Sequence, residues 1–110
     1  MEWLKSAMSL PKSWSGVIQD TASTSTLAAL LVAREKITDY QINQKGSDGT
    51  KLRVYCSSQT HSSIDKAVKI AGFGIENLVK VEVDDQMAMK PDSLLQAIKN
   101  DIKAGYTPCA

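Results

Sequence analysis

The feature that most constrains this chain is its hydrophobic pattern. Segments in which every second residue is apolar, as in a strand, alternate with segments in which apolar residues recur at helical spacing. Apolar and polar residues alternate over residues 52–56 and again over 78–83, which predicts two strands, and a shorter strand is predicted over 16–19. Between and around these segments, apolar residues recur at helical spacing. Strands that alternate with helices favour right-handed crossovers and a mostly parallel sheet with helices against it, so the predicted class is α/β.

Two of the predicted helices carry clear start and stop signals. A helix is predicted over residues 64–71. Ser62 and Asp65 have the spacing of a capping box at its start, and Gly72 ends it. A second helix begins at Pro91, carries a stripe of leucine and isoleucine, and ends at a glycine. Both helices are expected to lie against the sheet.

The first half of the chain is also expected to be helical, apart from one loop. Residues 1–9 should form a short amphipathic helix that Pro11 stops, and residues 27–33 should continue a helix that starts in the hydroxyl-rich segment 20–26. Because residues 27–33 are apolar on all sides, this helix should be buried on more than one face. Residues 43–51, with two glycines and no large apolar side chain, should form an exposed loop.

Length and composition restrict the function classes. The 110 residues, 43% of them apolar, suffice for one core and predict a single unit over residues 1–110. A net charge of +1 and scattered aromatic residues argue against nucleic-acid binding. Two separated cysteines and one histidine cannot supply a tetrahedral zinc set, so no metal is expected. The longest apolar run is too short to span a membrane and no secretory signal is recognisable, so a cytoplasmic location is expected.

Two clusters of hydroxyl side chains, residues 20–26 and 57–63, each follow a predicted strand. Ligands of parallel α/β sheets bind beyond the carboxyl ends of the strands, so the two clusters are the candidate site. The first cluster starts a helix, where backbone amides and hydroxyl groups can hold a phosphate group. The same residues can also be ordinary helix caps, and no glycine-rich nucleotide motif accompanies them.

His61 is the residue of the second cluster with the widest chemistry. At the mouth of a strand, its imidazole could act as an acid or base, bind a metal, or stack on a planar ligand. The alternative is a loop histidine that hydrogen-bonds its own backbone. The flanking serines and threonines are expected to serve mainly as turn and cap residues. Neither cluster contains a recognisable catalytic dyad.

Two segments have a distinctive residue order: GVIQDTASTSTLAALLVAR over residues 16–34 and VYCSSQTHSSIDKA over 54–67. They resemble the pyridoxal-phosphate-dependent group II amino-acid decarboxylases, and within that family the aromatic-L-amino-acid and tyrosine decarboxylases. The resemblance continues to the C-terminus. It implies that residues 1–110 are a portion of the large domain of a fold-type I enzyme, with a mostly parallel sheet whose next buried strand begins at Pro108.

The resemblance implies a cofactor and roles for the candidate residues. Thr21, Ala22 and Ser23 match the segment that holds the phosphate of pyridoxal 5′-phosphate at a helix start. His61 matches the histidine that stacks on the pyridine ring close to the reacting carbon, which makes it the implied catalytic residue. The implied reaction is the loss of carbon dioxide from an aromatic L-amino acid, in a lyase that forms homodimers.

Two differences from the family pattern bear on activity. Asp20 stands where the family commonly has glycine, and its carboxylate would repel a phosphate unless it turns away. None of the eleven lysines of the chain matches the lysine that bonds to the cofactor in the family. The chain alone is therefore expected to be an inactive fragment of a decarboxylase that binds the cofactor weakly or not at all. The alternative is a small non-enzymatic α/β module that associates with other chains.

Overall fold

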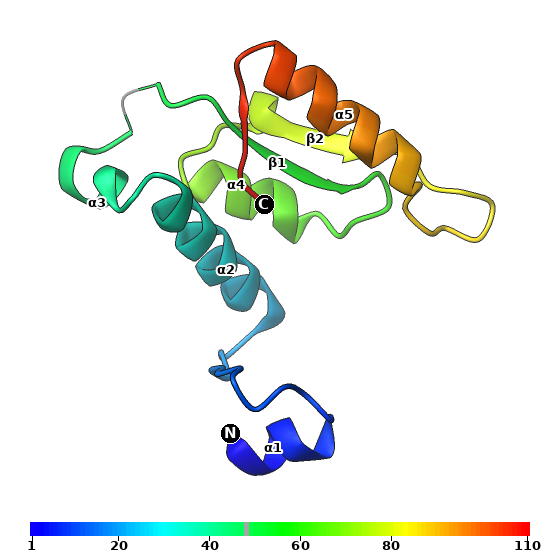
Figure 1. The fold of residues 1–110 in the computed structure, drawn as a ribbon. Helices are drawn as coiled ribbons and strands as arrows, with labels where there is room; N and C mark the ends of the chain where they lie inside the picture. Colours follow the sequence, from blue (N-terminus) through cyan, green and yellow to red (C-terminus); the bar gives the residue numbers. More distant parts are fainter. Residues whose placement is uncertain (48) are drawn as a thin grey trace.

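Three parallel strands organise the chain. In the computed structural model, which describes residues 1–47 and 49–110, β1 (Leu52–Ser57) lies between β2 (Leu78–Val81) and β3 (Thr107–Pro108) (Figure 1). β1 pairs with both neighbours in parallel register. The predicted α/β class and mostly parallel sheet are confirmed. The strand expected from the resemblance to begin at Pro108 is β3, and it begins one residue earlier, at Thr107.

Helices cover both faces of the sheet. α2 (Ala22–Ile37) and α4 (Ser63–Ile70) lie on one face, and α5 (Pro91–Lys103) lies on the other (Figure 1). The remaining helical elements are α1 (Glu2–Ala7), α3 (Gln41–Lys45) and a 3-10 turn, Ile75–Asn77. α5 begins at its proline, as predicted, because the fixed φ of proline suits a first helical turn. In the part of the chain that the structure describes, no helix is long and apolar enough to cross a membrane.

The core lies between β1 and the helix pair α2 and α4. Leu52, Val54 and Cys56 of β1 are buried while the residues between them are half-buried, as the predicted alternation requires. Leu30 of α2 and Val68 of α4 belong to the same buried cluster as Leu52 and Val54. Val68 is fully enclosed, so this layer is where burial of apolar surface stabilises the fold.

Residues 16–19 do not form the predicted strand. They make an irregular connection, and Val17 and Ile18 are 73% and 71% exposed. The structure pairs no strand with them among the residues it describes. A strand forms only where its N–H and C=O groups meet a neighbouring strand, so β-branched residues alone do not produce one here.

The predicted loop over residues 43–51 begins later than expected. α3 extends to Lys45, because Ile42 packs into the core and the amide of Asn43 hydrogen-bonds the carboxylate of Glu35. These two contacts fix a helical turn that has no apolar period of its own. Residue 48, within the predicted loop, lies outside the described residues.

α2 is not buried on more than one face. Leu30 is 7% exposed, whereas Val32, two residues further on, is 67% exposed. The side of α2 toward α4 is covered, and no element of the described chain covers the side that carries Val32. The all-round apolar composition of this helix therefore leaves hydrophobic surface open to solvent.

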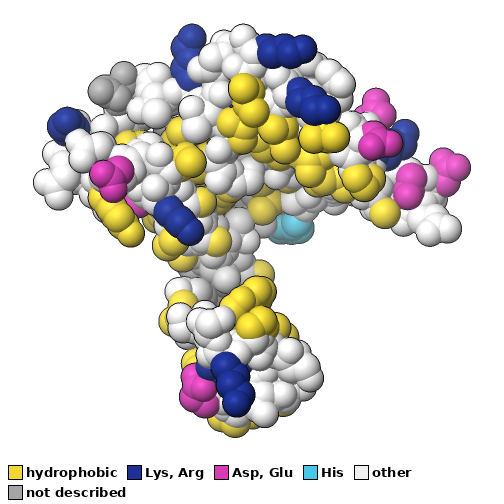
Figure 2. All heavy atoms as spheres, in the orientation of Figure 1, with side chains coloured by type: hydrophobic (Ala, Val, Ile, Leu, Met, Phe, Trp, Pro, Cys, Tyr) yellow, Lys and Arg dark blue, Asp and Glu magenta, His cyan; other side chains and the backbone are white. Residues whose placement is uncertain are grey.

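Residues 1–19 form an N-terminal arm that projects from the rest of the molecule (Figure 1). α1 lies in this arm, as predicted for residues 1–9, and has no buried residue. The Lys5 ammonium group donates to the carbonyl oxygens of Lys12 and Trp14, which folds the arm on itself. Hydrophobic side chains remain on its surface (Figure 2), among them Trp3 at 74% exposure.

Candidate functional site

The N-terminal ends of α2 and α4 border a shared groove. Its volume is about 190 Å³, and it is lined by Ser23, Thr24, Leu27, Ser63, Lys66, Ala67 and Ile70. The two helices run in the same direction, because Ser23 and Ser63 share the groove while Arg34 contacts Ala71 at the opposite ends. The fold thus brings the hydroxyl clusters 20–26 and 57–63 to one place.

The first turn of α2 is held by a reciprocal pair of threonines. The amide of Thr24 donates to Oγ1 of Thr21 (3.1 Å), and the amide of Thr21 donates to Oγ1 of Thr24 (3.2 Å). This capping box leaves the amides of Ala22 and Ser23 without a partner among the described residues. Two free amides at the positive end of a 16-residue helix, beside the Ser23 hydroxyl, suit a phosphate group.

Asp20 lies against the same helix start. Its Oδ1 accepts a hydrogen bond of 2.5 Å from the Thr24 hydroxyl, and this bond lowers the pKa of the carboxyl group below its ordinary value. The carboxylate therefore stays ionised beside the first turn of α2. It opposes an approaching anion, and because it is exposed, water and salt weaken that repulsion.

His61 lies at the start of α4, and the backbone fixes its ring. The amide of Ser63 donates to Nδ1 (3.1 Å), and the Ser63 hydroxyl lies 3.0 Å from the same atom. Since Nδ1 accepts the amide bond, the proton of the neutral ring is on Nε2. This geometry matches the alternative that the sequence left open, in which His61 is a loop histidine that hydrogen-bonds its own backbone. His61 is nonetheless exposed, so its ring remains accessible to a ligand.

The predicted capping box of Ser62 and Asp65 is wrong. Ser62 makes no side-chain cap. Its backbone already has helical angles (φ −59°, ψ −12°), whereas a capping residue normally has an extended backbone. Asp65 instead pairs with Lys80 of β2 at 3.0 Å. The hydrogen bond between these two side chains lowers the pKa of Asp65 and raises the pKa of Lys80. The first turn of α4 is therefore anchored to the sheet next to the groove.

The groove contains one predicted site residue and one cation that the sequence did not single out. Ser23 lines it, whereas Thr21, Ala22 and His61 lie outside its lining. Lys66 also lines the groove, and its ammonium group has no polar partner among residues 1–47 and 49–110. Its position three residues after Ser63 places both on one face of α4, which is the signal that could have found it.

Comparison with known proteins decides the family. The family model of the pyridoxal-dependent decarboxylase conserved domain matches residues 1–110. The chain belongs to the pyridoxal-dependent decarboxylase family. The resemblance seen in the sequence is thus confirmed, and pyridoxal phosphate is the cofactor of the family.

Individual decarboxylase-family relatives match nearly the whole chain. Tyrosine decarboxylase 2 of Narcissus pseudonarcissus is 38% identical over 98% of this chain and 23% of its own length. Phenylacetaldehyde synthase of Arabidopsis thaliana is 35% identical over the same shares. Catharanthus roseus tryptophan decarboxylase, solved with L-tryptophan, superposes with a TM-score of 0.84 at 33% identity, over 97% of this chain and 24% of that one. The chain therefore spans about a quarter of the length of the relatives it matches.

The residues of this pyridoxal-dependent decarboxylase segment fit the phosphate end of the cofactor. The unpaired amides of Ala22 and Ser23 and the Ser23 hydroxyl supply donors at the start of α2, and the Lys66 ammonium group adds positive charge from α4, while the groove between them is lined mainly by apolar surface. Asp20, which precedes the N-cap residue Thr21, is an acidic side chain hydrogen-bonded to this turn. Donors outnumber this exposed carboxylate, so the start of α2, at the edge of the groove, suits a phosphate.

Proposed function

We propose that this chain is the part of a pyridoxal-phosphate-dependent decarboxylase that holds the phosphate end of the cofactor. The groove between the N-terminal ends of α2 and α4 carries this proposal, because it joins two hydroxyl clusters that are separate in the sequence. Membership of the pyridoxal-dependent decarboxylase family supports the same assignment.

The residues near the groove have distinct roles in this proposal. The amides of Ala22 and Ser23, with the Ser23 hydroxyl, bind the phosphate, and Thr21 positions them through its capping box. His61 presents its ring to the pyridine ring of the cofactor, oriented by the amide of Ser63. When bound, pyridoxal phosphate supplies the electron-withdrawing ring that allows an amino acid to lose its carboxylate as carbon dioxide.

The proposed substrate class for the whole protein is the aromatic L-amino acids. The support is the set of similar proteins, which includes a tyrosine decarboxylase and a tryptophan decarboxylase. This chain contributes the cofactor side of that reaction, and we propose that it releases no carbon dioxide alone.

Amide chemical shifts test the phosphate site. Titration of the ¹⁵N-labelled chain with pyridoxal phosphate, and separately with inorganic phosphate, should shift the amides of Ala22 and Ser23 first. S23A should weaken binding about fivefold through the lost hydroxyl bond. S25A, which removes an exposed hydroxyl with no recorded partner two residues further on, should leave binding unchanged. Equal effects of the two variants, or no shift at residues 22 and 23, would reject the site.

A product assay tests the proposed inactivity. The chain is incubated with pyridoxal phosphate and L-tyrosine or L-tryptophan, and amine and carbon dioxide are measured. We expect no product above the rate with cofactor alone. Sustained release that His61→Ala abolishes would show that the chain is an active decarboxylase.

A second candidate function is a non-enzymatic association module. The observation in its favour is the exposed apolar surface of the N-terminal arm, where Trp3, Val17 and Ile18 are each more than two-thirds exposed. Such surface favours contact with another copy or with a longer family member. Sedimentation velocity of the chain alone tests self-association: a concentration-independent monomer contradicts contact with another copy.

A further inference from the structure

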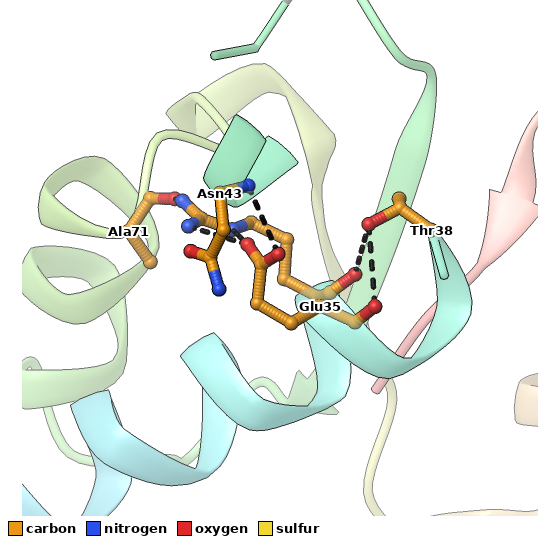
Figure 3. Close-up of polar contacts among 5 residues, drawn as sticks. Glu35, Thr38, Asn43 and Ala71 are labelled. Atoms are coloured by element: carbon orange, nitrogen blue, oxygen red, sulfur yellow. Dashed lines mark hydrogen bonds and ion pairs between the residues drawn. The ribbon is translucent and has the colours of Figure 1, made fainter. Parts of the chain in front are cut away.

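Arg34 and Glu35 form an ion pair within the C-terminal half of α2, and Arg34 also hydrogen-bonds the end of α4 (Figure 3). Nε and Nη2 of Arg34 donate to Oε1 of Glu35 at 3.0 and 2.8 Å, and Nη1 donates to the carbonyl oxygen of Ala71 at 2.5 Å. The Glu35 residue is only 7% exposed. The contact is therefore shielded from water, where charge-assisted hydrogen bonds are strong and their geometry is strict.

The same carboxylate also holds α3. Its second oxygen, Oε2, accepts from the amide of Asn43 at 3.0 Å (Figure 3). Gly72 follows directly, and a side chain on it would begin 3.7 Å from Nη1 of Arg34. Arg34 and Glu35 thus fix three elements, α2, α3 and α4, at one point.

The rest of the contact between α2 and α4 is apolar. Leu27, Leu30 and Leu31 of α2 pack in the same hydrophobic cluster as Ala67 and Val68 of α4. Contacts of this kind are non-directional, and the small Ala67 presents little relief to hold a neighbouring helix in register. Among the described residues, the hydrogen bond from Arg34 to the carbonyl oxygen of Ala71 is the directional contact between α2 and the end of α4.

The N-terminal end of α2, at the groove, lies far from the contact between Arg34 and Ala71. Residues 22–25 are all exposed, and the nearest apolar anchor of this turn is Leu27, which is partly buried against the core. Ser23 lies eleven residues before Arg34, which is about 16 Å along a helix. A swing of about 10° around Arg34 would move Ser23 by about 3 Å, roughly the length of a hydrogen bond.

We propose that Arg34 and Glu35 are positioning residues for the groove: Glu35 orients Arg34, and the hydrogen bond from Arg34 to the carbonyl oxygen of Ala71 sets the separation of Ser23 and Ser63 from the opposite end of α2. The structural part of this proposal concerns the two helices alone. Its consequence for pyridoxal phosphate rests on the proposed function of the groove.

Four variants of the full 110-residue chain test the proposal. R34M removes the guanidinium fork, R34K keeps the charge but not the fork, and E35Q keeps the shape and the contact with Asn43 while removing the charge. T38V is the matched control, because the Thr38 hydroxyl donates only to backbone carbonyls of α2 on the same turns. The readouts are amide chemical shifts at residues 23 and 63, and the dissociation constant of pyridoxal phosphate.

We expect R34M and E35Q to shift the amides of Ser23 and Ser63 and to weaken pyridoxal phosphate binding about fivefold. R34K should cause smaller changes than R34M in the two amide shifts and in the dissociation constant. T38V should leave the shifts and the dissociation constant unchanged. A variant that is merely less stable would keep the wild-type shifts in its folded population. Shifts confined to the residues around Arg34, Asn43 and Ala71 would overturn the proposal, even if every variant still bound the cofactor. Shifts at Ser23 and Ser63 without cofactor binding by any form would leave the positioning role standing and reject the phosphate site instead.

Discussion

Asp20 sets the charge at the mouth of the groove. Its carboxylate is ionised and hydrogen-bonded to Thr24, on the helix turn that offers free amides to a phosphate. D20N removes the charge and keeps an acceptor for the Thr24 hydroxyl. We expect it to tighten binding of inorganic phosphate about threefold, the size of a screened repulsion at a surface, measured by NMR titration at low salt.

The control for this variant is D39N. Asp39 carries the same charge at the other end of α2 and is likewise exposed. If D20N and D39N tighten phosphate binding equally, the net charge of the chain, and not the position of Asp20, governs that binding.

Thr21 is the residue that shapes the free helix start. T21A removes the oxygen that accepts the Thr24 amide and breaks the capping box, which should lower the free energy of unfolding by about 1 kcal/mol. Urea denaturation measures the change. S25A serves as the reference, and a T21A midpoint equal to that of S25A would show that the cap does not contribute in solution.

At the scale of elements, α4 has one face in the core and one in solvent. Val68 is fully buried, whereas Ile70, two residues later, is 70% exposed. V68A should lower the free energy of unfolding by about 2 kcal/mol, because it removes two methyl groups and leaves a cavity. I70A removes more side chain yet should cost less than about 0.5 kcal/mol. Similar urea midpoints for the two would contradict the assigned orientation of α4.

β1 is joined to α5 by a tyrosine that must stay protonated. The Tyr55 hydroxyl donates to Oδ2 of Asp101 at 2.8 Å, and burial together with this carboxylate raises the pKa of Tyr55 far above its ordinary value of 10.0. The unfolded chain loses that proton first, so stability is full below about pH 10 and falls as the pH rises above it.

Y55F tests this linkage. Without the hydroxyl, the urea midpoint should be lower at pH 8 and should fall less steeply between pH 9 and 11. Parallel pH profiles of Y55F and the wild type would show that another group controls alkaline unfolding.

The sequence predicted those elements whose partners lie nearby. The alternation over 52–56 and the signals around Pro91 were sufficient, since each segment carries its own period and its own ends. The strand over 16–19 was wrong because strand formation depends on a neighbouring strand and not on Val17 and Ile18 alone. The cap at Ser62 was wrong because the backbone of Ser62 is already helical, which the residue spacing alone does not reveal.

For the candidate site, the sequence located both clusters but not the contacts between them. That Ser23 and Ser63 share a groove depends on how α2 lies on α4, which in turn depends on Arg34 reaching the carbonyl of Ala71. A backbone acceptor has no signature in the sequence. Lys66 was missed for a related reason, because a lone exposed lysine is informative only once its neighbours are known.

At the scale of the whole molecule, the N-terminal arm is separate from the core. The recorded hydrogen bonds of Lys5 lie within residues 1–19, and α1 has no buried residue. A chain that begins at residue 20 should therefore unfold at the same urea concentration as the full chain. It should also associate less in sedimentation velocity, because Trp3 and the other exposed apolar side chains of the arm are gone. A large drop in the urea midpoint would place the arm against the core in solution.

The order of the strands in the sheet has a consequence for how the chain folds. β1 pairs with β2 across the short connection that holds α4, but with β3 only after the chain has passed through α5. Closing the shorter loop costs less chain entropy, so β1, α4 and β2 should form the folding nucleus and β3 should dock last. In native-state hydrogen exchange, the amide of Thr107 should accordingly open more readily than the amides within β1.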